Sequence, residues 1–242
     1  MGESFGAWTM GADELLMAFV SSINVACGFH AGDPTVIRKT IETALKKQVT
    51  IGARPSFPDL QGFGRRAMAL SANEIFDTVL YQVAALKGMT EACGGKLHHV
   101  KPHGALYNQA ATNQEVAAAI ARAVQSIDKN LIFYGLSNSF LISEAEKIGL
   151  MTASEVFADR TYQTNGTLTP RTQPNALIEN SEMAAAQVLE MIKTGAVTTV
   201  ENNRSQLRAE TVCIHGDGKH ALDFAKSIRQ KLTENNIEVR SI

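Results

Sequence analysis

The stretch INVACGFHAGDP, residues 23–34, shows the unit from which the fold is built. Residues 23–27 are apolar apart from Asn24, which is typical of a buried strand. The polar turn that follows ends in Asp33 and Pro34; aspartate can cap a helix, and proline is favoured at the first helical position. The next apolar residues recur at i, i+4, i+7 and i+8, which is one face of a helix: Ile37, Ile41, Ala44 and Leu45. The stretch therefore predicts a strand, a turn and a helix in that order.

The same alternation continues along the chain. Further strands are expected at 49–53, 97–100, 131–134, 154–157, 211–214 and 237–239. Helices are expected from the capping-box pattern of Ser71 and Glu74 onward, and at 113–127, 138–148, 181–195 and 221–232. Strands separated by helices favour right-handed βαβ units and a parallel sheet. No linker or repeat interrupts the pattern, so residues 1–242 are predicted to form a single domain.

Polar clusters follow directly after the predicted strands, at 28–33, 54–59, 101–104, 159–160 and 215–217. No G-x-G-x-x-G follows the first strand, so the usual signature of an open dinucleotide-binding sheet is missing. In parallel β/α proteins the carboxyl ends of the strands share one face, and active sites lie there. We therefore predict an α/β fold, an irregular parallel TIM-like β/α barrel, with a catalytic face built from these clusters.

Composition narrows the functional class. The 242 residues carry 23 Lys+Arg and 24 Asp+Glu, and this even balance argues against a nucleic-acid partner. The cysteines are Cys27, Cys93 and Cys213; they form no C-x-x-C pair, which argues against a disulfide framework or a cysteine–zinc site. No apolar run is long enough for a membrane span, and residues 1–6 lack a signal-peptide pattern. These features predict a soluble cytoplasmic protein.

The predicted catalytic residues come from the clusters after the strands: His30, Asp33, Lys101, His103 and Asp217. In an extended segment 98–103, Lys101 and His103 share a face with His99, and Pro102 marks the end of the strand. A lysine there can bind an oxyanion, and a histidine can transfer protons near pH 7. His98 points the other way and is expected to be structural.

Structural explanations for several of these residues stay open. His30 and His215 would also be explained as buried histidines bonded to backbone carbonyls. Asp33 and Asp217 would also be explained as helix caps.

The polar loop 159–171 is the predicted substrate-binding segment. It contributes Asp159, Arg160, Tyr162 and Arg171, and His215 is placed with them. A guanidinium can bind a carboxylate through two parallel hydrogen bonds, although an ordinary surface loop would show the same composition. The sequence has neither a G-x-x-x-x-G-K-[ST] phosphate loop nor a G-x-S-x-G elbow, so no nucleotide site is predicted within this chain.

The same clusters resemble those of the LamB/YcsF family. The matching segments are GESFG at 2–6, NVACGFHAGD at 24–33, PSFPD at 55–59, KPHGALY at 101–107, VFADR at 156–160, PR at 170–171 and HGD at 215–217. The resemblance implies an irregular barrel of the glycoside hydrolase/deacetylase type. It also implies a complex with 5-oxoprolinase subunits B and C that opens 5-oxoproline to L-glutamate while ATP becomes ADP and phosphate. ATP is then a cosubstrate whose chemistry is shared with, or carried out by, those partners.

Two departures from the family pattern bear on these expectations. The family has a short strand before the Gly-Glu stretch, and here Met1 coincides with that stretch, so we expect the barrel to lack one strand. Arg54 stands where the family pattern has histidine, so no metal ligands are assigned. Two alternatives remain: a metal-dependent amidase or carbohydrate deacetylase, and a non-catalytic subunit that presents substrate to its partners.

Overall fold

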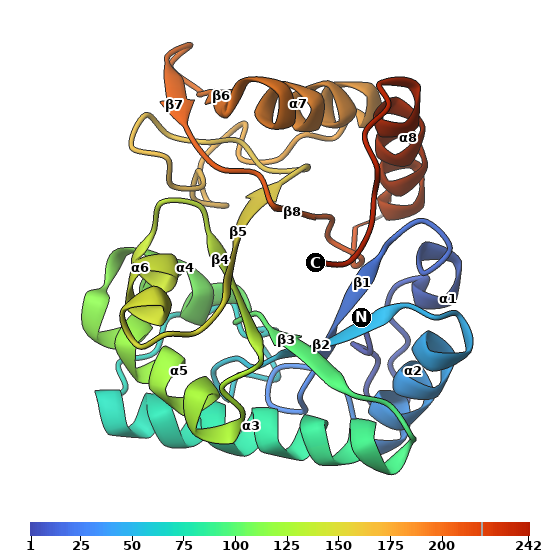
Figure 1. Cartoon of the computed structure of the whole chain (residues 1–242), viewed down its shortest axis with the longest axis vertical. Helices are drawn as coiled ribbons and strands as arrows, with labels where there is room; N and C mark the ends of the chain where they lie inside the picture. The colour runs from blue at the N-terminus through green and yellow to red at the C-terminus, as the bar shows by residue number, and fades with distance from the viewer. Residues whose placement is uncertain (219) are drawn as a thin grey trace.

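A curled parallel sheet forms the centre of the molecule. The computed structural model describes residues 1–218 and 220–242. Six strands follow the order β1-β2-β3-β4-β5-β8, and every neighbouring pair is parallel. Their bounds are β1 (Ser22–Ala26), β2 (Thr50–Arg54), β3 (Leu97–Val100), β4 (Ile132–Leu136), β5 (Thr152–Phe157) and β8 (Thr211–Cys213). The helices lie outside the curl (Figure 1). The predicted α/β fold is confirmed, as a half-barrel rather than a closed ring.

The helices and a small hairpin complete the chain. The helices are α1 (Asp13–Leu16), α2 (Pro34–Lys46), α3 (Ala72–Ala92), α4 (Gly104–Thr112), α5 (Gln114–Ile127), α6 (Phe140–Lys147), α7 (Ser181–Thr194) and α8 (Ala221–Glu234). Strands β6 (Ala196–Thr198) and β7 (Arg204–Gln206) pair antiparallel. The sequence did not predict α1, α4 or this hairpin. The strand predicted at 237–239 is wrong, because these residues alternate in polarity but pair with no strand of the described sheet.

Helix α2 begins with the aspartate cap and the proline that the sequence predicts. The Asp33 carboxylate accepts hydrogen bonds from the backbone N–H groups of Thr35 and Val36, and Pro34 occupies the first turn. These contacts satisfy amides that have no partner inside the helix. The turn after β1 is thereby held in place, which positions the residues that follow the strand.

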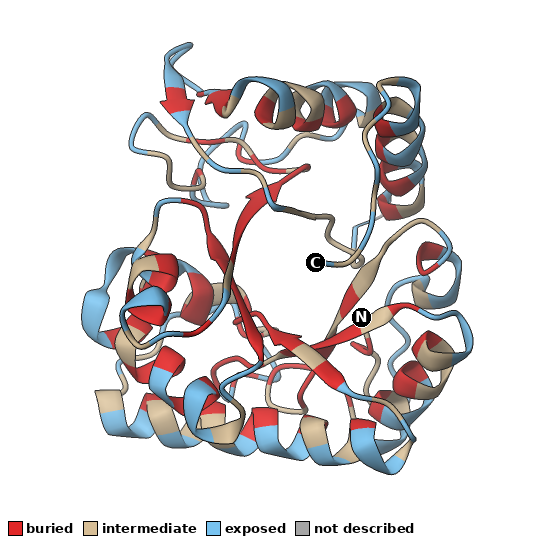
Figure 2. Ribbon diagram, in the orientation of Figure 1, coloured by how far each residue is buried: buried red, intermediate tan, exposed pale blue. Residues whose placement is uncertain are grey.

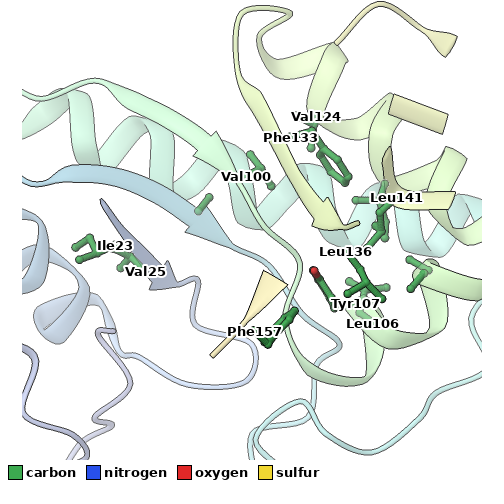
Figure 3. Close-up of a cluster of buried hydrophobic side chains, with 14 of the residues drawn as sticks. Ile23, Val25, Val100, Leu106, Tyr107, Val124, Phe133, Leu136, Leu141 and Phe157 are labelled. Atoms are coloured by element: carbon green, nitrogen blue, oxygen red, sulfur yellow. The ribbon is translucent and has the colours of Figure 1, made fainter. Parts of the chain in front are cut away.

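The hydrophobic core lies between the outer face of the sheet and the helices. Ile23 and Val25 of β1 and Phe133 of β4 are buried there. Figure 3 shows Phe133 beside Val124 of α5, and Figure 2 shows that buried residues concentrate on the strands and on the sheet-facing sides of the helices. Each such side chain contributes roughly 1.5–3 kcal/mol on burial, so this layer supplies most of the stability of the fold.

The inner face of the sheet is polar. Asn24, Gly52 and His99 lie in register across β1, β2 and β3. The His99 imidazole stacks on Tyr134 with a centroid distance of 4.1 Å, and its Nε2 lies 3.1 Å from the Asn24 Oδ1. A Cβ added to Gly52 would lie 2.1 Å from the His99 Nε2, so only glycine leaves room for the ring.

The two edge strands of the sheet face a common cavity of about 410 Å³. Residues of β1 and β8 line it, together with the C-terminal segment 237–242. Its polar walls come from the inner face of the sheet. None of the helices in residues 1–218 and 220–242 combines the length and apolar character that a membrane span requires.

Candidate active site

Lys101 lies at the centre of a buried polar cluster on the cavity wall. It follows β3, and its Nζ lies 2.6 Å from Oε1 of Glu155 on β5. The same Nζ donates to the Cys213 Sγ at 2.9 Å, and the Tyr107 hydroxyl donates to the Glu155 Oε2 at 2.9 Å. Lys101, Glu155 and Cys213 all line the cavity. Three strands and α4 therefore bring these four side chains together.

The electrostatics of this cluster favour an ammonium on Lys101 and a neutral thiol on Cys213. Burial acts to lower the pKa of Lys101, but the contacts with Cys213 and Glu155 outweigh it and raise this pKa. Burial raises the pKa of the Cys213 thiol to about 11, although Lys101 acts in the opposite direction. Lys101 thus remains a positive charge at neutral pH, and Cys213 accepts its hydrogen bond as a thiol.

His215 and Asp159 form a second pair beside the same cavity. The His215 Nδ1 lies 2.9 Å and 2.8 Å from the two Asp159 carboxylate oxygens. Burial acts to raise the pKa of Asp159, but His215 outweighs it and this pKa is lowered. An ionised Asp159 accepts a hydrogen bond from the His215 Nδ1–H, which orients the ring and directs Nε2 away from this pair. The only described contact of that Nε2 is a 3.4 Å approach from the Arg171 Nη2, so a proton could be exchanged there.

The predicted pair His30 and His103 is brought together but is closed off. Their rings stack at a centroid distance of 4.2 Å, and the His103 Nε2–H donates to the Phe63 carbonyl at 2.8 Å. Burial and the positive charge of Arg54 lower the pKa of His30 to about 3, and the same two causes lower the pKa of His103. Neither residue lines the cavity. Both imidazoles are therefore neutral, and their catalytic role stays a prediction.

The two predicted aspartates make structural contacts. Asp33 caps α2 and also accepts from the Gly6 N–H at 2.9 Å. Asp217 pairs with the Arg65 Nη2 at 2.6 Å on a partly exposed surface. The cap predicted for Asp33 is confirmed, and catalysis by either aspartate stays a prediction.

Arg160 and Tyr162 hold the predicted substrate loop from within. Arg160 is 4% exposed and donates to the backbone oxygens of Ala176 and Thr169. The Tyr162 hydroxyl accepts from the Phe157 N–H at 2.7 Å. Neither side chain lines the cavity, whereas Arg171 is exposed beside His215. Substrate binding by Arg160 would require these loop contacts to open, and this assignment also stays a prediction.

No site role was predicted for Glu155, Cys213 or Arg54, which line the cavity with Lys101. Strand alternation could have indicated that Glu155 is buried, because it shares a face of the strand with the apolar residues Ala153 and Phe157. Nothing local distinguishes Cys213, since its partner is more than 100 residues away in the chain.

Comparison with known proteins assigns the family. The sequence profile of the LamB/YcsF family matches residues 1–242. The chain belongs to the LamB/YcsF family. The predicted family is therefore confirmed over the whole chain.

Similar LamB/YcsF proteins have names that bear on function. The 5-oxoprolinase A subunit of Bacillus subtilis (strain 168) is 54% identical over 242 residues, which are 100% of this chain and 94% of that protein. The 5-oxoprolinase A subunit of Bacillus cereus (strain AH187) is 55% identical over 240 residues, 99% of this chain and 95% of the relative. The crystal structure of the lactam utilization protein from Thermus thermophilus has a TM-score of 0.94 and 42% identity, and the match covers 100% and 97% of the two chains.

The residues around His30 do not fit the metal site that related deacetylases suggest for this LamB/YcsF protein. Within the described part of the chain, no three His, Cys, Asp or Glu side chains converge to hold a metal ion. Arg54 stands at the family's histidine position, and its guanidinium is a positive charge that acts on His30. The same positive charge would repel a divalent cation bound by His30.

Proposed function

We propose that this chain is one component of an ATP-dependent 5-oxoprolinase and takes part in opening 5-oxoproline to L-glutamate. Two relatives of nearly full length, both more than 50% identical, are named as the A subunit of 5-oxoprolinase. A structural neighbour is named for lactam utilization. The observation that carries the proposal is the placement of Lys101, Glu155 and His215 on one cavity of about 410 Å³. That volume suits a small cyclic amide, since ligand pockets typically span about 300–1,000 Å³.

The reaction needs ATP because a lactam nitrogen donates electrons into the carbonyl and makes its carbon a poor electrophile. Transfer of the terminal phosphoryl group of ATP to the lactam oxygen releases ADP and converts the lactam into an O-phosphorylated imidate, whose carbon is a better electrophile. One water then adds to the carbonyl carbon, and the C–N bond breaks as the ring nitrogen takes up a proton. The resulting acyl phosphate reacts with a second water to give phosphate and L-glutamate. One ATP and two waters are consumed for each ring opened.

The cavity residues suit the hydrolytic part of this sequence. The His215 Nε2, oriented by Asp159, would take a proton from the attacking water and later return one to the ring nitrogen. The Lys101 ammonium would stabilise negative charge on the oxygen of the reacting carbon. We assign phosphoryl transfer to partner subunits, such as subunits B and C, because the sequence contains no phosphate-loop motif.

The test is glutamate formation from 5-oxoproline and ATP by the chain together with the two partner subunits. Asp159→Asn should lower kcat by about 10²- to 10⁴-fold, because the imidazole loses the partner that fixes its tautomer. His215→Asn should have a similar effect, with little change when the two substitutions are combined. The matched controls are His220→Asn and Asp223→Asn, from an exposed pair whose Nδ1 and Oδ2 atoms are 4.0 Å apart.

The outcomes separate the proposal from its rivals. Turnover that needs all subunits and falls in the Asp159 variant supports it. Full turnover in Asp159→Asn, His215→Asn and Lys101→Met would instead identify a protein that presents substrate to its partners. Absence of glutamate from the wild-type complex would remove the proposed reaction.

A further inference from the structure

Arg54 places a second positive charge on the cavity wall beside Lys101. It is the last residue of β2, and its side chain is 11% exposed. Because Gly52 faces His99 on the inner side of the sheet, Arg54, two residues further on, faces the same side. The Lys101 backbone N–H donates to the Ala53 carbonyl at 2.9 Å. Arg54 and Lys101 therefore lie side by side at the carboxyl ends of β2 and β3. Both side chains line the cavity.

Glu3 orients Arg54 without using all of its donors. The Arg54 Nη1 donates to the Glu3 Oε1, and this is the one hydrogen bond that the guanidinium makes within residues 1–218 and 220–242. Burial acts to raise the pKa of Glu3, but the amino terminus and Arg54 outweigh it and lower this pKa to about 2. A guanidinium has five N–H donors, so most of them remain. None of the Arg54 nitrogens is fully buried without a partner, so those donors stay accessible from the cavity.

We propose that Arg54 binds the carboxylate of the substrate, so that this cavity takes a small cyclic monocarboxylate. A planar guanidinium fork matches a carboxylate through two parallel hydrogen bonds. The two arginines of the predicted substrate-binding segment 159–171 are less suited to binding this carboxylate. Arg160 already donates to the backbone of its own loop, and Arg171 is exposed. When the carboxylate is bound to Arg54, the lactam carbonyl of the substrate lies toward Lys101, which follows the adjacent strand β3. The identity of the ligand as 5-oxoproline rests on the proposed function.

This assignment also gives a role to the departure at position 54. Where the family pattern has histidine, this chain has a permanently charged group that a buried carboxylate holds in place. The charge needs neither a proton near neutral pH nor a metal ion.

The experiment is a calorimetric titration of the full chain with three probes. These are 5-oxoproline, the same lactam without its carboxylate (2-pyrrolidone), and a ring with a carboxylate but no lactam (cyclopentanecarboxylate). The wild type should bind 5-oxoproline about 10-fold or more tighter than 2-pyrrolidone, as expected for hydrogen bonds to a charged group. Arg54→Gln should bring this ratio close to one, and Arg54→Lys should keep part of it. Arg38→Gln, an exposed arginine paired with Glu42 on α2, should match the wild type.

A second variant keeps the test valid if Arg54→Gln does not fold. Glu3→Gln combined with Arg54→Gln removes both charges and leaves no buried carboxylate without a partner. The same loss of carboxylate preference is expected in it. A preference retained in either folded variant, or a wild type that binds neither carboxylate probe, would overturn the inference.

The outcome is separable from that of the proposed function. Arg54-dependent binding of both carboxylate probes, with no glutamate formed by the complete complex, would keep the carboxylate site and remove the proposed reaction. Glutamate formation with the same KM for 5-oxoproline in the wild type and Arg54→Gln would keep the reaction and overturn the site.

Discussion

The buried ion pair between Lys101 and Glu155 makes a strong prediction for stability. Its two charged atoms are 2.6 Å apart, and the side chains are 6% and 2% exposed. In Lys101→Met, Glu155 keeps the hydrogen bond from Tyr107 but loses its only cation in the described structure. An unpaired buried charge costs about 3–5 kcal/mol, so we expect the free energy of unfolding to fall by about that amount.

The assay is urea unfolding at pH 7, followed by circular dichroism, with a double-mutant cycle. Glu155→Gln combined with Lys101→Met should lose less than the sum of the single changes, because no charge is then left alone. Lys87→Met breaks a surface pair whose side chains are 26% and 52% exposed, and should lower the free energy of unfolding far less than Lys101→Met. The reasoning is refuted if Lys101→Met is no more destabilising than Lys87→Met, or if the effects simply add.

Three further predictions concern packing, pH and a buried hydrogen bond. Gly52→Ala should lower the free energy of unfolding by about 1–3 kcal/mol in urea because its methyl group would overlap the His99 ring; Gly88→Ala, in open space on α3, should be neutral or stabilising. The pKa of His30 is about 3 in the folded protein and near 6.5 ordinarily, so wild-type stability should decline as pH falls from about 6.5 toward 3. His30→Asn should remove up to about 1.4 kcal/mol of this decline per pH unit, and an unchanged slope in pH-dependent thermal unfolding would contradict this. Tyr162→Phe should lower the free energy of unfolding by about 1–3 kcal/mol, because the Phe157 N–H loses its acceptor, and equal urea midpoints would argue against that contact.

Local patterns predicted most of the fold because the signals that start and pair its elements are local. The cap at Asp33 and the capping box at Ser71 lie within four residues of the amides they bind, so both helix starts could be predicted. Helix α4 was missed because it begins directly after His103, within a stretch dominated by its candidate catalytic residues. The strand at 237–239 was predicted from a short β-branched run, and such a run does not by itself supply a partner strand.

The site was predictable only where chemistry follows a strand directly. Lys101 and His215 were identified in this way, and both line the cavity. Their partners were harder to find, because the contacts of Lys101 with Glu155 and Cys213 join distant segments of the chain. The loop contacts of Arg160 were equally hidden from the sequence, because its guanidinium donates to backbone oxygens of Thr169 and Ala176. A single sequence shows which side chains are available for a site, but not which of them contact one another in the folded protein.

The open half-barrel also affects how this protein meets copies of itself. An unpaired strand edge usually invites a strand from another molecule, and exposed edges are sites of aggregation. Here β1 and β8 turn toward the same cavity, and residues 237–242 line the space between them. Met1 already bonds part of the free edge of β1, because its amino group donates to the Asn24 carbonyl and its carbonyl accepts from the Ala26 N–H. Curling the sheet and covering the gap thus give much of the protection of a closed barrel, without a continuous ladder of hydrogen bonds.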